Sequence, residues 1–261
     1  MEKRILAIRR DDRYSPNSEE NDRAILQSVI DRLGTGVMMI DEVDFTTDDD
    51  ADVYLSMGRM AATVSLLKHK EDNGALVINS GYGVEACTRS RLEKTMRQYH
   101  IPMPAMTDDA GFWLKRGDET AQNKNDVVYC KDETALTKAK AEFRRRGIID
   151  MVVSAHVRGD LIKFYGVVGG FFRYFYPCDD HQSKFGDELV NGEAHHYKFD
   201  LGHLQQTVAR LAKIVRIDIY GGDAIVEANG NINIIDFNDW PSFSRCREDA
   251  ADAIARYINE K

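Results

Sequence analysis

The chain has little cysteine, and none of it is paired in sequence. Its four cysteines among 261 residues are Cys87, Cys130, Cys178 and Cys246, and they form no CxxC pair or histidine–cysteine cluster. Scattered thiols of this kind are typical of a reducing cytosol. The sequence therefore predicts neither a disulfide framework nor a zinc site.

Excess positive charge and long apolar runs are also missing. Acidic residues outnumber basic ones by 43 to 35, the formal net charge is -8, and we expect no nucleic-acid partner. The most apolar segment, 164–172, contains Gly169-Gly170 and is far shorter than the ~20 residues of a membrane helix. The first ten residues lack the apolar stretch of a signal peptide. We therefore expect a cytoplasmic protein without membrane partners.

The first hundred residues alternate between strand-like and helix-like segments. Short buried-type strands are predicted at 4–8, 37–40, 53–57 and 76–80, with helices at 19–33, 59–70 and 90–100. This alternation is typical of a parallel sheet covered by helices. Pro102 and Pro104 then break the last helix. The sequence predicts an α/β fold that opens with a Rossmann-like domain at 1–101.

Antiparallel pairing is favoured after this boundary. Strands are predicted at 112–115, 127–130 and 148–157, a hairpin at 161–176, and helices at 132–146, 203–215 and 247–258. The long polar segment 177–200 is a candidate lid. We expect a second domain at 102–261, built from a small lobe at about 102–156 and a larger lobe at about 157–261.

A hairpin near the C-terminus carries the most informative polar residues. Asn229-Gly230 between two alternating runs favours a two-residue type I′ turn. Pairing Ala228 with Asn231 then places Asp223 directly opposite Asp236. Like charges that face each other across a ladder are destabilising unless a cation lies between them or one is protonated.

The same register brings a third oxygen ligand to this corner. Asn238 projects on the same face as Asp236, and Gly221, predicted opposite Asn238, leaves space beside it. Carboxylate and amide oxygens suit a hard divalent cation that completes its shell with water and phosphate. The sequence therefore predicts a Mg²⁺-nucleotide site at Asp223, Asp236 and Asn238, with solvated acids at a sheet edge as the alternative.

The C-terminal third resembles the metal-binding end of ATP-grasp enzymes. The resemblance is carried by Arg-Ile-Asp-Ile-Tyr-Gly-Gly-Asp-Ala-Ile-Val at 216–226 and Ile-Ile-Asp-Phe-Asn-Asp-Trp-Pro-Ser-Phe at 234–243. Upstream, the segments 76–80, 101–104 and 112–115 are similar to the entry of the nucleotide domain in that family. The resemblance implies that ATP lies between two α+β lobes.

The resemblance also implies roles for individual residues. Asp223, Asp236 and Asn238 would hold Mg²⁺, and Lys115 would reach the α- or β-phosphate of ATP. Arg91 or Lys94 would add a second phosphate contact. The implied ATP-binding residues are Lys115, Arg91, Lys94, Ala155, His156, Val157, Asp160 and Lys163.

The implied hinge departs from the family pattern. Segment 154–157 would face adenine with its backbone, but it lacks the glutamate that is common there, and Asp160 would replace that residue toward the ribose. The loop 117–126, which would cover the phosphates, is polar and poor in glycine. Backbone cradling of phosphate is therefore not expected from the sequence.

Two reactions remain open for such an enzyme. Most ATP-grasp enzymes phosphorylate a carboxylate that an amine then captures, as the ribosomal-protein glutamate ligases and glutathione synthetases do. A minority, the inositol phosphate kinases, phosphorylate a hydroxyl, and the strand that starts at Lys163 resembles theirs. The overall acidity of the chain disfavours a polyphosphate substrate. We place the carboxylate–amine ligase first, the kinase second and a non-catalytic nucleotide-binding module third.

Several basic residues are candidates for the small-molecule acceptor and for catalysis. Arg9, Arg10 and Arg13 follow the first strand, where open α/β sheets place ligand-binding loops. Arg173 is a candidate for stabilising charge in the transition state. His196 and Lys198, in the polar loop, are candidates for closing over the γ-phosphate. No motif indicates an oligomeric state.

Overall fold

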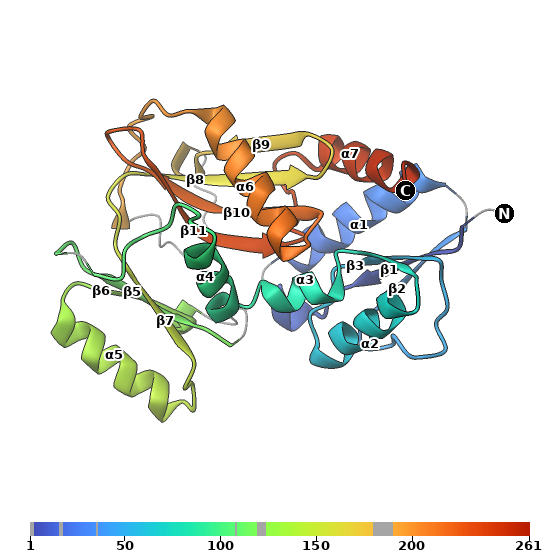
Figure 1. The fold of residues 1–261 in the computed structure, drawn as a ribbon, viewed down its shortest axis with the longest axis horizontal. Helices are drawn as coiled ribbons and strands as arrows, with labels where there is room; N and C mark the ends of the chain where they lie inside the picture. The colour runs from blue at the N-terminus through green and yellow to red at the C-terminus, as the bar shows by residue number, and fades with distance from the viewer. Residues whose placement is uncertain (1–2, 16–17, 35, 108, 119–123, 180–189) are drawn as a thin grey trace.

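The computed structural model describes residues 3–15, 18–34, 36–107, 109–118, 124–179 and 190–261. They form a mixed α/β structure with three separate sheets, as Figure 1 shows. The predicted α/β class is confirmed. No helix among these residues is long and apolar enough to cross a membrane.

The first sheet is parallel, as the alternating segments predicted. Its strand order is β2-β1-β3-β4, and every pair in it runs parallel. The strands are β1 (Ile5–Arg9), β2 (Val37–Asp41), β3 (Val53–Ser56) and β4 (Leu76–Ile78), and the helices between them are α1 (Glu19–Leu33) and α2 (Ala61–Asp72). A short 3-10 turn, η1 (Asp12–Tyr14), separates β1 from α1.

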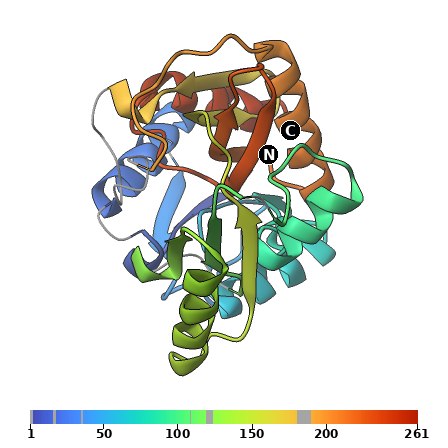
Figure 2. The same cartoon turned by 90° about the vertical axis from the view of Figure 1, so that its left-hand side faces the viewer.

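Two helices lead from this sheet to the small lobe. They are α3 (Gly81–Ala86) and α4 (Arg89–Gln98). The small lobe is an antiparallel sheet of order β6-β5-β7. Its elements are β5 (Phe112–Arg116), η2 (Lys124–Asp126), β6 (Val127–Cys130), α5 (Glu133–Arg145) and β7 (Met151–Ala155). In Figure 2 this lobe, with α5 in green, projects away from the rest of the chain.

The larger lobe is built on a second antiparallel sheet, of order β11-β10-β8-β9. Its elements are β8 (Asp160–Val167), β9 (Phe171–Phe175), η3 (Pro177–Asp179), α6 (Leu201–Val215), β10 (Ile219–Val226) and β11 (Ile232–Asp239). Helix α6 buries Leu204, Val208, Leu211 and Val215 against the sheet. These positions recur at intervals of four and three, which place them on one helical face.

The last helix returns to the beginning of the chain. Helix α7 (Arg247–Asn259) packs on α1, and the two share a core in which Leu26 and Ile254 are fully buried. On the exposed side of this contact, Arg32 forms an ion pair with Glu248 at 2.8 Å. The C-terminal helix therefore covers part of the first sheet's helical layer.

A buried asparagine connects the first sheet to the larger lobe. The Asn79 amide nitrogen donates to the Ile219 carbonyl at 2.7 Å, and its oxygen accepts from the backbone nitrogens of Asp218 and Ile219 at 2.9 and 2.8 Å. Because Asn79 is fully buried and β10 begins at Ile219, these bonds fix where the metal-candidate hairpin starts.

The hairpin between β10 and β11 has the predicted register at its polar end, but a different turn. Asp223 lies opposite Asp236, as the sequence predicted. The predicted type I′ turn is wrong: the loop has three residues, and only Gly230 has positive φ, at 85°. The third loop residue shifts the pairing near the turn by one position. A bulge at Ile235, which has no partner in the ladder, shifts it back, so Asp223 still pairs with Asp236.

Two predicted loops lie partly outside the described residues. The candidate lid is described only at 177–179 and 190–200, and the candidate phosphate loop only at 117–118 and 124–126.

Candidate functional site

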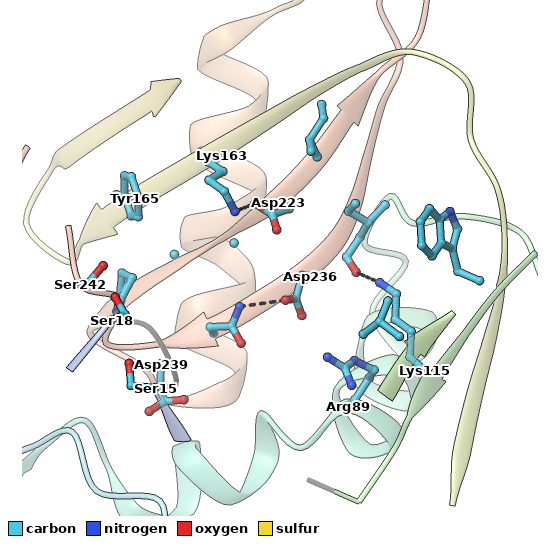
Figure 3. Close-up of a pocket in the computed structure, with 18 of the residues that line it drawn as sticks. Ser15, Ser18, Arg89, Lys115, Lys163, Tyr165, Asp223, Asp236, Asp239 and Ser242 are labelled. Atoms are coloured by element: carbon cyan, nitrogen blue, oxygen red, sulfur yellow. Dashed lines mark hydrogen bonds and ion pairs between the residues drawn. The ribbon is translucent and has the colours of Figure 1, made fainter. Parts of the chain in front are cut away.

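A cavity of about 630 Å³ opens where the lobes and the first domain meet. Figure 3 shows side chains from β5, β8, β10 and β11 pointing toward it. The start of α1 and the segment after β11 supply the opposite end of its lining. The cavity therefore brings together residues that are more than 200 positions apart, such as Ser18 and Ser242.

The two facing carboxylates line this cavity. Lys163 Nζ lies 2.9 Å from Asp223 Oδ1, and the Asn238 side-chain nitrogen donates to Asp236 Oδ2 at 3.0 Å. Burial alone would raise the pKa of Asp236, but the positive charges of Arg89 and Lys115 lower it below its usual range. Asp236 is therefore an ionised carboxylate at neutral pH.

The donor chemistry of this corner fits a divalent cation. Among the described residues, no group of three or more histidine, cysteine or acidic side chains is placed to hold a metal ion. The candidate ligands here are therefore two carboxylates, completed by one side-chain amide. Asp223, Asp236 and Asn238 supply only oxygen ligands of the kind that Mg²⁺ takes when phosphates complete its shell. The sequence predicts open space beside Gly221, but the Pro241 ring fills part of it. A Cβ atom at position 221 would lie 2.8 Å from Pro241 Cγ.

Lys115 reaches across the cavity from the small lobe. Its Nζ donates to the carbonyl oxygen of Ile235 at 2.9 Å. Ile235 is the bulged residue of β11, so the ladder does not use this carbonyl. The lysine predicted to hold phosphate thus lies one residue from Asp236.

The basic residue of α4 that lines the cavity is a different one from those that the sequence suggested. Arg91 and Lys94 are exposed on α4, do not line the cavity, and Arg91 instead pairs with Glu85 at 3.0 Å. Arg89, the first residue of α4, lines the cavity and donates to the Arg116 carbonyl at 2.5 Å. At 3.6 residues per turn, positions two and five residues beyond Arg89 face away from it.

Ala155, His156 and Val157, which the sequence predicts to face adenine, line the cavity. The backbone nitrogens of Ala155 and His156 donate to Ala105 and Gly111 at 2.8 and 2.9 Å. The backbone N–H groups of Ala155 and His156 are therefore already hydrogen-bonded to other parts of the protein. Trp113 Nε1 also lies 3.2 Å from His156 Nδ1, so an aromatic pair lines this end.

Asp160 is placed away from the cavity. Its carboxylate is buried and accepts the backbone nitrogens of His195 at 2.7 Å and Tyr197 at 2.8 Å. As the first residue of β8 it faces the 195–197 segment, which explains why it does not extend toward a ribose.

Of the three early arginines, only Arg10 lines the cavity. It is buried, and its Nε lies 3.1 Å from Asp22 Oδ2. Arg9 pairs with Asp41 at 2.5 Å, whereas the exposed Arg13 pairs with a neighbouring acid at 3.0 Å. Successive residues after a strand point in different directions, so one of the three enters the cavity.

The remaining basic candidates do not reach the cavity. Arg173 is exposed on β9 and pairs with Asp249 at 3.2 Å. His196 packs on Tyr176, with ring centroids 4.3 Å apart, and Lys198 is exposed. None of the three lines the cavity, whereas Arg245, which sequence reasoning missed, does.

Sequence reasoning also missed a buried ion pair and a group of hydroxyls. Arg59 lies 2.7 Å from Asp239 Oδ1, and both side chains are less than a tenth exposed. The hydroxyl-bearing residues at this end of the cavity are Tyr14, Ser15, Ser18, Ser242 and Ser244. They come from two segments without a recognisable motif, and only the tertiary fold brings them together.

Neither a family model nor a curated protein matches the sequence. The three-dimensional structure does match solved ones. The D-alanine-D-alanine ligase from Coxiella burnetii has 13% identity and a TM-score of 0.63, with 98% of this chain and 96% of that chain covered. A RimK domain ATP-grasp protein from Sphaerobacter thermophilus has 17% identity and a TM-score of 0.65, with 98% and 99% covered. The ATP-grasp ligase PsnB, complexed with a minimal precursor, Mg and ADP, has 12% identity and a TM-score of 0.61, with 98% of each chain covered. The chain therefore has the ATP-grasp fold.

Proposed function

We propose that this protein is an ATP-dependent ligase that uses Mg-ATP to phosphorylate a small carboxylate, which an amine then captures. The observation that carries the proposal is the arrangement within one cavity. Two cations, Lys115 and Arg89, lie on the side of the small lobe and α4, and three oxygen ligands lie on β10 and β11. Phosphoryl transfer needs positioning and charge stabilisation of this kind and little covalent help from the protein.

Each part of the cavity has a separate task in this proposal. The hinge end, at His156 and Val157, holds the base, and Lys115 and Arg89 hold the phosphates as fixed positive charges. Asp223, Asp236 and Asn238 hold Mg²⁺, which when bound neutralises charge on the phosphate oxygens. Asp236 is already ionised and needs to lose no proton to do so.

The chemical step then follows from the geometry of the far end. An acceptor carboxylate beside the hydroxyls and Arg10 attacks the γ-phosphorus, and the bond from that phosphorus to the bridging oxygen breaks, which releases ADP. The amine nitrogen attacks the acyl carbon, and the carbon–oxygen bond to phosphate breaks. The nitrogen transfers one proton to the departing phosphate.

The ligase is preferred over a kinase because of the structural neighbours. D-alanine-D-alanine ligase and PsnB are both ligases by name, and each matches the chain over nearly its whole length. Phosphorus NMR of the products checks this preference. Free phosphate that appears together with an amide supports the ligase, whereas a stable phosphoester would indicate a kinase.

The metal-binding role of Asp236 is tested by Asp236→Asn. Titration calorimetry with a nonhydrolysable ATP analogue should show Mg²⁺-dependent binding to the wild type. The variant should bind at least about tenfold more weakly, because a ligand charge is lost, while its circular dichroism stays unchanged. Exposed Asp48→Asn is the matched control and should bind like the wild type. Equal Mg²⁺-dependent affinity in all three proteins would remove Asp236 from the site.

A further inference from the structure

Glu42 is a buried carboxylate that lies outside the candidate site. It directly follows β2, is only 2% exposed and does not line the cavity. The strands β2, β1 and β3 are parallel neighbours, so their carboxyl ends lie at one edge of the first sheet. The segments that leave these three strands therefore meet where Glu42 lies.

The Glu42 carboxylate binds the backbone of the other two segments. Its Oε1 accepts from the backbone nitrogen of Asp11 at 2.6 Å, and its Oε2 accepts from those of Arg59 and Met60, both at 2.8 Å. The chain passes so close that a Cβ atom at Gly58 would lie 3.0 Å from Oε2. A buried carboxylate with three N–H donors holds these donors in one arrangement. Glu42 therefore fixes the segment after β1 relative to the segment after β3.

An arginine in each of these segments binds the end of β11. In the segment after β1, the Arg10 Nη2 donates to the Trp240 carbonyl oxygen. In the segment after β3, Arg59 lies 2.7 Å from Asp239 Oδ1 and donates to the Asp239 backbone carbonyl at 3.1 Å. Both arginine side chains are less than a tenth exposed, where hydrogen bonds are electrostatically stronger than in water. The two segments therefore hold the strand end at two successive residues.

The charge of Glu42 also acts on this cluster. Burial and the neighbouring Arg59 lower the pKa of Arg10, whereas the carboxylates of Asp22, Asp239 and Glu42 oppose this effect. A neutral side chain at position 42 would leave the buried Arg10 charge less compensated. Glu42 therefore stabilises the cluster both by hydrogen bonds to the backbone and by its negative charge.

The strand end that the arginines hold connects two parts of the candidate site. In the sequence, the candidate Mg²⁺ ligand Asn238 precedes it, and Ser242, at the acceptor end of the cavity, follows it. We propose that Glu42 is a positioning residue, which fixes these two parts relative to each other through Arg10 and Arg59. The inference rests on the proposed function, in which the metal and the acceptor must be held together. Because Glu42 lies outside the cavity, it takes no part in bond formation or proton transfer.

Glu42→Gln tests the effect on the metal. The variant keeps the side-chain shape but loses the charge and turns an NH₂ group toward backbone donors. In calorimetry with the nonhydrolysable ATP analogue, the Mg²⁺ concentration for half-maximal binding should rise about tenfold. A loss of folded protein alone would lower the amplitude of binding without moving this midpoint. A wild-type midpoint in Glu42→Gln would overturn the proposal.

Asp160→Asn is the matched control for this titration. The Asp160 carboxylate is also buried and accepts two backbone nitrogens, at 2.7 and 2.8 Å. It lies opposite Val226, however, at the turn end of the β10–β11 hairpin. Its Mg²⁺ midpoint should therefore equal that of the wild type. An equal rise in both variants would show that any buried carboxylate has this effect, and would also overturn the proposal.

Amide hydrogen exchange measures the strand end directly, without nucleotide. The Trp240 backbone nitrogen donates to the Ile219 carbonyl at 2.8 Å, so its exchange reports opening of this end. In Glu42→Gln the Trp240 amide should exchange about tenfold faster than in the wild type. The amide of Ala224, fully buried in the same sheet, should keep its rate. Unchanged Trp240 exchange, or an equal rise at both amides, would overturn the proposal.

A backbone variant carries the test if Glu42→Gln does not fold. Met60→Pro deletes one of the three N–H donors, and the Met60 φ of -59° suits proline. Met60→Ala keeps this N–H group and is the control. The Mg²⁺ midpoint should rise about threefold in Met60→Pro and stay unchanged in Met60→Ala. Equal midpoints in the two variants would contradict the role of Glu42.

The two measurements separate this inference from the proposed function. If no protein binds the analogue, the proposed function is wrong and the metal role of Glu42 is wrong with it. Faster Trp240 exchange in Glu42→Gln would then still show that Glu42 holds the strand end. If the wild type binds the analogue and Glu42→Gln has the same Mg²⁺ midpoint, only this inference is wrong.

Discussion

Arg59 and Asp239 form a charged pair between the first domain and the end of the metal-candidate strand. Burial alone would lower the pKa of Arg59, but the adjacent Asp239 carboxylate outweighs this effect and raises it. The Arg59 guanidinium also donates to the Asp239 backbone carbonyl at 3.1 Å. Since Asn238 precedes Asp239, we expect this pair to fix the strand end that carries a candidate metal ligand.

Breaking the pair should be costly. Arg59→Met leaves the Asp239 carboxylate buried without its partner, and we expect a loss of about 3–5 kcal/mol in the free energy of unfolding. Urea denaturation measures it. The exposed pair of Arg4 with Asp52 is the control, and Arg4→Met should cost only about 0–1 kcal/mol. Similar small losses in both variants would show that the buried pair does not stabilise the strand end.

Residues on regular strands were predictable, whereas those set by tertiary packing were not. Asp223 and Asp236 were found because strand pairing follows from local spacing. Arg59 was missed because its partner lies 180 residues away and only the packed domains bring them together. Arg91 was preferred to Arg89 because the sequence does not fix where α4 begins within one turn.

At the scale of elements, the β10–β11 hairpin shows how two deviations restore a register. The loop is one residue longer than the Asn-Gly motif predicts, and the bulge at Ile235 compensates for it. The bulge also frees the carbonyl that accepts from Lys115. A sequence motif predicts the presence of a hairpin, but the position of a bulge depends on contacts across the cavity.

The close approach of these strands requires glycine at position 222. A Cβ there would lie 2.2 Å from the Asp236 carbonyl oxygen and 2.6 Å from the Phe164 ring. Gly222→Ala should therefore destabilise the protein by at least about 1–3 kcal/mol and weaken Mg²⁺-dependent nucleotide binding. Thermal denaturation and calorimetry measure the two effects. Gly202→Ala in α6, where the nearest atom is a side-chain oxygen at 3.3 Å, should change both less. An unchanged Gly222→Ala protein would contradict this account of the strand pairing.

At the scale of the whole molecule, the first and last helices form one layer. Ile25, Leu26 and Val29 of α1 share a core with Ala251 and Ile254 of α7, and all five are fully buried. The sequence predicted both helices, and α1 with its observed bounds. Their contact was not predictable, because an amphipathic face shows that a helix packs without showing against which element.

Removal of α7 should unfold the first domain, because α1 would lose the helix that it packs against. A chain that ends at residue 246 exposes several large apolar side chains of α1, each worth about 1.5–3 kcal/mol, which together approach the usual stability of a domain. We expect no cooperative transition in calorimetry. The control ends at residue 259 and loses only exposed positions. If the chain that ends at residue 246 melts like the control, packing of α7 on α1 is not required for the first domain to fold.

The contact between α1 and α7 also affects how the chain is made. Helix α7, which covers α1, is synthesised only after the more than 200 residues that separate the two helices in the sequence. Translation proceeds at about 5–20 residues per second, so the apolar face of α1 is exposed for on the order of ten seconds or more before α7 has been synthesised. During that interval the apolar face of α1 is exposed, and synonymous codons that slow translation between the two helices would lengthen the exposure.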